Sequence, residues 1–275
     1  MDINITTLTE NTANAGLMAE WGLSILIEAD NKRILLDTGA GFSAVYNAQL
    51  LGIDFRTIDL IVLSHGHYDH TGGLKDILSR RGEVDIIAHP SIWDPKYAIR
   101  GIDKRYIGIP FLREQLETLG ARFTLSGAPV WISDNILTSG EVPMTTDYEE
   151  TDKILYVKKD EGYKPDTFPD DLSLAIKTEM GLAIFLGCAH RGMINIMRHF
   201  QTITGDDRIY SIVGGTHLIS ASSERLDRTV ADLKKTGIRR LGVSHCTGFE
   251  ASARLAAEFK DIFFLNSAGS KYKLL

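Results

Sequence analysis

The sequence predicts an α/β protein folded as a four-layer αββα sandwich. Each half of the chain opens with hairpin-like strand pairs and closes with strands that alternate with helices. Short aliphatic runs bounded by turn residues indicate strands, and apolar residues at helical spacing indicate helices. Because the two halves repeat one pattern, we expect two mixed sheets packed face to face, with helices on both outer sides. Strands resume on each side of every polar stretch, so residues 1–275 are predicted to form one domain.

The first half is predicted to begin with an alternating strand and a hairpin that turns at Asp30-Asn31. A stretch of helical periodicity and two buried-looking strands follow. In chain order, the predicted elements are strands over 2–9, 23–28 and 33–37, a helix over 42–51, and strands over 59–64 and 84–88.

The second half is predicted to open with a hairpin that turns at Glu179-Met180-Gly181. Strands and amphipathic helices then alternate to the end of the chain, which is strand-like. The predicted elements are strands over 172–177 and 182–186, a helix over 192–200, a strand over 209–213, a helix over 223–235, a strand over 239–244 and a helix over 249–259.

Two intervening segments break this rhythm. Residues 93–113 are rich in aromatic and basic side chains, and an irregular connection of this length is usually functional or disordered. We expect this segment to form a mobile flap at the entrance to the functional site, where Arg100 and Arg105 would bind an anionic group. A solvated surface excursion or a subunit contact is the alternative. Residues 149–171 are polar and proline-punctuated, which predicts a loop.

The composition narrows the class of protein. A net charge of -6 does not favour nucleic-acid binding through a general basic field. Only two cysteines occur, which is typical of a reducing compartment. The N-terminus shows no signal-peptide pattern, and no apolar run approaches a membrane span. We therefore expect a cytoplasmic protein without a membrane partner; the sequence does not indicate its oligomeric state.

The most informative stretch is the loop His65-Gly66-His67-Tyr68-Asp69-His70, which follows the strand over 59–64. Its carboxylate and three imidazoles are potential metal ligands at the carboxyl end of a strand, where α/β sheets present ligand sites. This donor set suits zinc, and also iron or manganese. His65 and His67 can bind one ion while Asp69 and His70 face a second. The sequence therefore predicts a site for one or two ions.

Other candidate ligands follow later strands. His190, His217 and His245 each come directly after a buried-looking strand, so we expect them to meet the first loop at one edge of the sandwich. His217 is interpreted as a ligand or as a substrate contact. Cys188 is a possible ligand, although a small buried cysteine is the more ordinary interpretation. His89 precedes a proline and is interpreted as structural.

The pattern His-x-His-x-Asp-His after a hydrophobic strand resembles the signature of the metallo-β-lactamase superfamily. The resemblance implies a first ion held by His65, His67 and a later histidine such as His190. It implies a second ion held by Asp69, His70 and His245.

The superfamily often supports the histidine loop with an aspartate at the position of Asp37, which is not itself a ligand. It usually bridges the two ions with an aspartate from a Gly-Asp pair. Here the pair is Gly187-Cys188. Either His190 replaces the bridge, or the bridging role is lost.

Further segments are similar to one branch of the superfamily, the dihydropterin–ribofuranosylaminobenzene phosphate synthase group. They are Ala19 to Ser24, Ser139 to Pro143, Gly187 to Gly192 and Ser244 to Gly248.

Three functions remain open from the sequence. The first is hydrolysis of a small ester, lactone or phosphoester by metal-activated water, with Asp69 orienting the water or accepting its proton. The second, implied by the branch, is transfer of a pterin-methyl group with loss of diphosphate. The third is a non-catalytic metal-binding module. The first two act on a small-molecule substrate, which would be anionic if Arg100 and Arg105 contact it.

Overall fold

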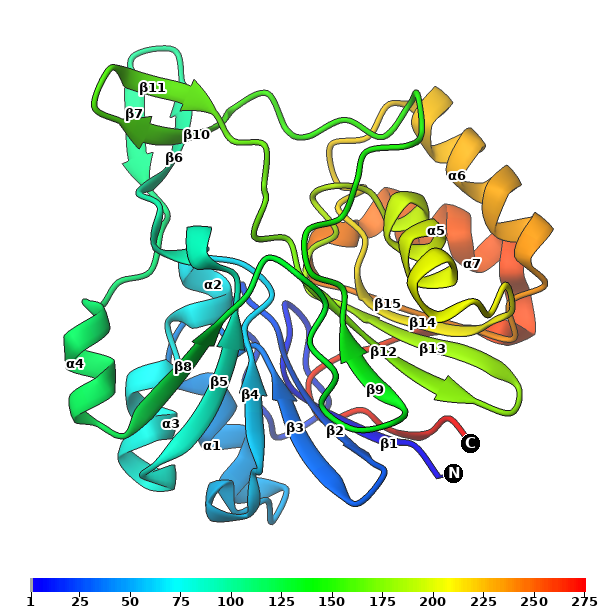
Figure 1. Ribbon diagram of the computed structural model, residues 1–275. Helices are drawn as coiled ribbons and strands as arrows, with labels where there is room; N and C mark the ends of the chain where they lie inside the picture. Colours follow the sequence, from blue (N-terminus) through cyan, green and yellow to red (C-terminus); the bar gives the residue numbers. More distant parts are fainter. Residues whose placement is uncertain (1) are drawn as a thin grey trace.

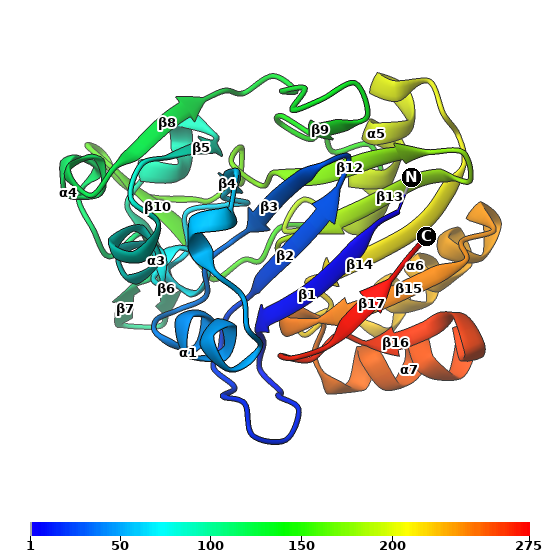
Figure 2. The ribbon, with the colours of Figure 1, turned by 90° about the horizontal axis from the view of Figure 1, so that it is seen from below.

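The computed structural model describes residues 2–275, and it confirms the predicted four layers (Figures 1 and 2). A seven-stranded and a six-stranded sheet pack face to face. One group of helices covers the outer side of the first sheet, and α5, α6 and α7 cover the outer side of the second (Figure 1). No helix within residues 2–275 combines the length and the apolar character needed to cross a membrane.

The seven-stranded sheet has the order β17-β1-β2-β3-β4-β5-β8, antiparallel from β17 to β3 and parallel from β3 to β8. Its strands are β1 (Asn4–Thr9), β2 (Ser24–Ala29), β3 (Lys32–Leu36), β4 (Leu60–Val62), β5 (Val84–Ala88), β8 (Ala121–Leu125) and β17 (Lys271–Lys273). The helices of this half are α1 (Ser43–Leu50), α2 (Tyr68–Thr71), α3 (Leu74–Arg81) and α4 (Arg113–Thr118), with 3-10 turns η1 (Phe55–Thr57) and η2 (Pro90–Trp93).

The six-stranded sheet has the order β16-β15-β14-β13-β12-β9, parallel from β13 to β16 and antiparallel from β9 to β13. Its strands are β9 (Ile136–Thr138), β12 (Ser173–Thr178), β13 (Gly181–Leu186), β14 (Ile209–Gly215), β15 (Arg240–Ser244) and β16 (Phe263–Leu265). Its helices are α5 (Met193–Thr204), α6 (Ser223–Thr236) and α7 (Phe249–Phe259), with 3-10 turns η3 (His245–Thr247) and η4 (Lys260–Ile262).

The alternation of side chains along each strand creates the layers. In β2, Ile25 and Ile27 point into the layer between the two sheets, whereas Leu26 points towards α1 and α3. Both faces of the strand are therefore buried, which stabilises the fold by roughly 1.5–3 kcal/mol for each large aliphatic side chain. This two-sided burial explains why the central strands read as continuous apolar runs.

A small third sheet corrects part of the prediction. Strands β6 (Lys96–Arg100), β7 (Asp103–Tyr106), β10 (Leu155–Lys159) and β11 (Gly162–Pro165) form an antiparallel sheet of order β11-β10-β6-β7. We call it the cap sheet, because it stands off from the two large sheets (Figure 1, upper left). The expectations of an irregular segment over 93–113 and a loop over 149–171 were wrong here. Local patterns cannot reveal the pairing of β6 with β10, because more than fifty residues separate the strands.

Candidate metal centre

The predicted ligands lie at the carboxyl ends of parallel strands from both large sheets. The loop from His65 to His70 follows β4 and runs into α2. His190, His217 and His245 follow β13, β14 and β15. Gly66 allows the loop to pass close to the neighbouring chain, since a Cβ there would lie 2.2 Å from the carbonyl oxygen of Ile92. The structure thus brings all these candidates to one edge of the sandwich.

The first triad of donors is His65, His67 and His190. His65 Nε2 lies 3.0 Å from His67 Nδ1 and 3.2 Å from His190 Nε2. Nitrogen ligands of a tetrahedral zinc ion, bonded at about 2.0–2.1 Å, lie about 3.3 Å apart. Burial lowers the pKa of each of these imidazoles well below its ordinary value. They are therefore neutral, with lone pairs available to a metal.

The second triad is Asp69, His70 and His245. His245 Nε2 lies 3.2 Å from His70 Nε2 and 3.3 Å from Asp69 Oδ2. Burial alone would raise the pKa of Asp69, but the hydrogen bond from His245 and the charge of His70 hold it below its usual range. This carboxyl group is therefore ionised. The spacing of His245 from the other two donors again matches a tetrahedral ion.

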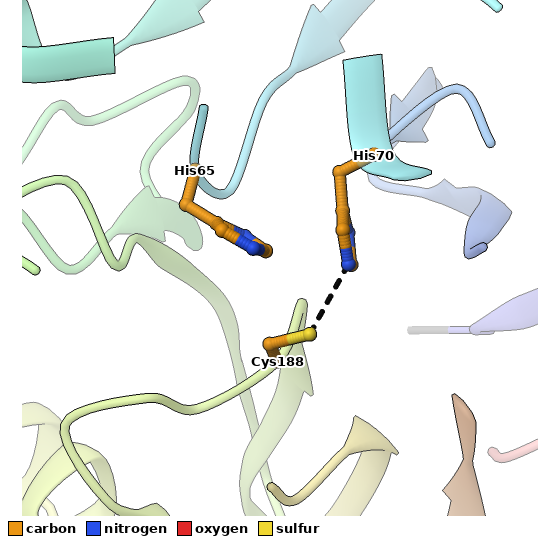
Figure 3. Close-up of side chains that lie close together, drawn as sticks. All are labelled: His65, His70 and Cys188. Atoms are coloured by element: carbon orange, nitrogen blue, oxygen red, sulfur yellow. Dashed lines mark hydrogen bonds between the residues drawn. The ribbon is translucent and has the colours of Figure 1, made fainter. Parts of the chain in front are cut away.

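Cys188 lies within 4.8 Å of donor atoms from both triads. Figure 3 shows it beside His65 of the first triad and His70 of the second. Its Sγ is 3.1 Å from His70 Nε2. His65 and His70 come from the first half of the chain and point towards this cysteine, which belongs to the second half (Figure 3). A thiol thus stands where the Gly-Asp pattern of the superfamily has its aspartate, and it lies against a candidate metal ligand.

Further side chains orient the ligands from behind. Asp37 accepts hydrogen bonds from His70 Nδ1 at 2.6 Å and from the backbone and hydroxyl of Ser64 at 2.7 Å. This is the supporting position that the sequence suggested for Asp37. Asn11 Oδ1 lies 2.9 Å from His245 Nδ1, opposite the metal-facing nitrogen. A hydrogen bond to the second nitrogen fixes the orientation and tautomer of a ligating histidine.

The remaining two candidate histidines, His217 and His89, lie in different surroundings. The ring of His217 lies 4.1 Å from that of His190, and both of its nitrogens are buried without a hydrogen-bond partner. It can therefore face a metal or a substrate, and both interpretations stay open. His89 Nδ1 accepts the backbone N–H of Ser91 and caps η2, which agrees with a structural role.

A cleft of about 410 Å³ opens over the donors. Arg100 and Arg105, from β6 and β7 of the cap sheet, line it together with Trp21 and Tyr68. Arg105 hydrogen-bonds the hydroxyl of Tyr68 at 3.2 Å. The predicted flap therefore faces the donors through its two arginines, and its mobility stays a prediction. A second cavity of about 470 Å³ adjoins the cleft, with His217 lining both.

Comparison with known proteins agrees with this architecture. Residues 22–172 match the sequence profile described as the metallo-beta-lactamase superfamily. The chain belongs to that superfamily. It is 37% identical, over 99% of its length and 97% of the relative, to the 7,8-dihydropterin-6-methyl-4-(beta-D-ribofuranosyl)-aminobenzene-5'-phosphate synthase of Methanocaldococcus jannaschii. The branch indicated by the sequence is thereby confirmed.

Other relatives extend the comparison. An uncharacterized protein of the same archaeon is 34% identical over 92% of this chain and 93% of its own length. The crystal structure of Tm1679, described as a metal-dependent hydrolase of the beta-lactamase superfamily, has a TM-score of 0.85 and 26% identity, with 98% of both chains covered. The synthase and the hydrolase are named as enzymes, and this member of the superfamily is an enzyme too. The alternative of a non-catalytic module is not retained.

In this protein, the loop from His65 to His70 and the ring of His190 are held in place by residues that the sequence analysis did not predict. Lys96 Nζ contacts Asp166 Oδ2 at 2.7 Å and Asp170 Oδ1 at 2.9 Å, all three buried. Asp170 Oδ2 in turn accepts the backbone N–H of Gly66 at 2.9 Å. The ring of Phe168 stacks on His190 with centroids 3.9 Å apart. No local sequence signal marks these contacts, because each joins segments that are far apart in the chain.

Strained backbone also marks this edge. Asp37, Ala189, His217 and His245 all have positive φ angles between 49° and 59°. Such conformations cost of order 1–3 kcal/mol for residues other than glycine, and they concentrate at functional sites. Their gathering around the donors supports a functional role for this edge.

The protonation of His70 predicts how metal binding depends on pH. Burial lowers the pKa of His70, but the nearby Asp37 and Asp69 carboxylates outweigh burial and raise it to about 9 in the metal-free protein. A metal must displace that proton, so the affinity for metal should rise by at least about tenfold per pH unit below pH 9. Metal titrations between pH 6 and 10 would check this slope. A flat profile would contradict it.

Proposed function

We propose that this protein is a metal-dependent transferase that joins a dihydropterin, through its methyl group, to an aminobenzene that carries a ribofuranosyl 5'-phosphate. The main support is the full-length similarity to a synthase whose name describes that product. The arrangement carrying the proposal is a donor cluster at the floor of a cleft whose opposite wall presents Arg100 and Arg105. Basic side chains above metal ligands suit a substrate that carries phosphate groups.

The donor set fits zinc best, because its ligands are imidazoles, a carboxylate and a nearby thiol at tetrahedral spacing. His65, His67 and His190 would hold one ion, and Asp69, His70 and His245 a second. Bound divalent ions would supply positive charge that stabilises a departing diphosphate. Iron or manganese is the alternative metal.

The reaction forms one bond and breaks another. The aminobenzene nitrogen forms a bond to the pterin methyl carbon, and the bond from that carbon to the diphosphate oxygen breaks. The electron pair leaves with the diphosphate, and the proton on nitrogen is released to a base. Arg100 and Arg105 bind phosphate oxygens, and Trp21 and Tyr68 offer aromatic faces to the planar rings. The adjoining second cavity gives room for a second substrate.

Hydrolysis is the second candidate, and the similarity to Tm1679 favours it. The same centre would then activate water against a small phosphoester, ester or lactone, with the ionised Asp69 orienting the water or accepting its proton. Zinc-loaded protein should be incubated with a dihydropterin diphosphate, with and without the phosphorylated aminobenzene. A coupled product found by mass spectrometry supports transfer. Diphosphate release without an acceptor, or turnover of phosphoesters or lactones, supports hydrolysis instead.

Replacing Arg100 and Arg105 together with alanine is expected to raise KM for a phosphorylated substrate about 10- to 100-fold per lost contact, since a hydrogen bond to a charged group contributes about 1.5–3 kcal/mol. Metal content should not change, because neither arginine belongs to a donor group. Arg113→Ala is the matched control, since that arginine pairs with Glu117 outside the cleft. Unchanged kinetics in the double variant would remove the cap sheet from substrate binding.

A further inference from the structure

We propose that the Cys188 thiolate is a shared ligand that bridges the two metal ions of this centre. The inference rests on the metal centre of the proposed function and assigns a role to the residue that replaces the usual aspartate. The ordinary interpretation, a small cysteine packed as a hydrophobe, fits the surroundings poorly. Its sulfur lies within 4.8 Å of imidazole nitrogens, and Cys188 belongs to none of the hydrophobic clusters of the described chain.

The position of the Cys188 sulfur, close to donors of both triads, supports a bridging role. Among residues 2–275, five groups of three donor atoms lie within 4.8 Å of one another, and Cys188 belongs to three of them. No other residue belongs to more than two. Its partners include His65 and His190 of the first triad and His70 and His245 of the second. Cys188 is thus the donor that both triads share.

The number of protein ligands available to each ion also supports a bridging thiolate. Each triad supplies three donors, and a tetrahedral ion takes four. One bridging thiolate would give both ions a fourth protein ligand, and a zinc ion can expand to five ligands when a substrate oxygen binds. The thiolate would also add negative charge, since Asp69 is the only carboxylate in the donor groups of the described chain. Two divalent ions in a buried site need such compensation.

The backbone places the sulfur where this role requires it. Gly187 lets the end of β13 approach the histidine loop, since a Cβ there would lie 2.1 Å from Ser64 Oγ. Any side chain at that position would push Cys188 away from His65 and His70. His217 adds an independent sign of a ligand on the other side. Its side chain is nine-tenths buried, both ring nitrogens lack a hydrogen-bond partner, and one of them belongs to a donor group with Cys188 and His190.

Cys246, the second cysteine, has contacts that suit a structural role rather than a bridging one. Cys246 Sγ lies 3.3 Å from the backbone nitrogen of His217 and 3.4 Å from the carbonyl oxygen of Cys188. These contacts anchor η3 to the ends of β13 and β14, and Cys246 belongs to only one donor group. It is therefore the matched control for Cys188.

Two chemical consequences follow for the bridge. Burial raises the pKa of the Cys188 thiol in the metal-free protein, so binding of cations must release its proton. A soft sulfur bridge also favours zinc, cobalt or ferrous iron over manganese, which prefers oxygen ligands. A site with the usual aspartate would discriminate less strongly.

The test uses the whole protein loaded with cobalt(II). The wild type and Cys246→Ala should bind two equivalents and show a near-ultraviolet thiolate-to-cobalt charge-transfer band. Cys188→Ala should lose the band and at least one equivalent of cobalt. Cys188→Asp should regain two equivalents without the band, as expected for a carboxylate bridge. A band that survives in Cys188→Ala, or a wild type with two ions and no band, would overturn the inference.

X-ray absorption at the cobalt edge provides a measurement that does not depend on the folding of the Cys188 variants. In cobalt-loaded Cys246→Ala protein, a sulfur shell in the coordination of both ions supports the bridge. Nitrogen and oxygen shells alone would overturn it. A wild type that binds no metal would overturn both this inference and the proposed function. Product formation at a site without sulfur would leave the function standing and reject only the bridge.

Discussion

Replacing His65 and His67 together with alanine is expected to remove the metal ion of the first triad and abolish turnover. The two residues supply two of the three imidazoles at that position, and His190 alone cannot hold the ion. Activity should fall by about a thousandfold or more, since the charge that drives the chemistry would be lost. Elemental analysis should show at least one equivalent less metal per chain than in the wild type.

His199→Ala is the control for this double variant. His199 lies on α5, hydrogen-bonds the carbonyl oxygen of Ser139 at 2.8 Å and belongs to no donor group. Its loss removes an imidazole without touching the centre, so metal content should stay at the wild-type level. Unchanged metal occupancy in the His65 and His67 variant, with the fold intact by circular dichroism, would refute the assignment of this loop.

The sequence contained enough local information to predict the four layers and the metal-binding edge. Apolar residues recur every two residues in strands and about every 3.6 residues in helices, so both can be recognised from the sequence. The loop from His65 to His70 concentrates four potential metal ligands within six residues. His190 and His245 could be anticipated because each follows a buried strand. Their convergence then followed from the general rule that strands of an α/β sheet present ligands at their carboxyl ends.

The remaining features depend on contacts between distant segments. Asn11 reaches His245 across 234 residues, and neither position carries a pattern that indicates the other. The cap sheet likewise depends on pairing between β6 and β10, so its strands looked irregular when each was considered alone. The setting of Cys188 was open for the same reason. Only the folded chain reveals that its sulfur lies among five histidines from both halves.

Lys96 shows how much stability can depend on such a hidden contact. Lys96→Met is expected to destabilise the protein by about 3–5 kcal/mol, the usual cost of removing one member of a buried ion pair. Asp166 and Asp170 would remain buried without their cation, since both accept hydrogen bonds from Lys96 Nζ. Urea unfolding of the metal-free variant would measure the change.

The effect should also reach the metal centre. Asp170 holds the backbone of Gly66 between two ligands, and Phe168 stacks on a third, so freeing this segment should weaken metal binding as well as folding. Lys159→Met is the matched control, because Lys159 pairs with Asp94 at the surface, where an ion pair contributes about 0–1 kcal/mol. If Lys96→Met unfolds at the same urea concentration as Lys159→Met and binds metal as tightly, the buried triad does not support the histidine loop.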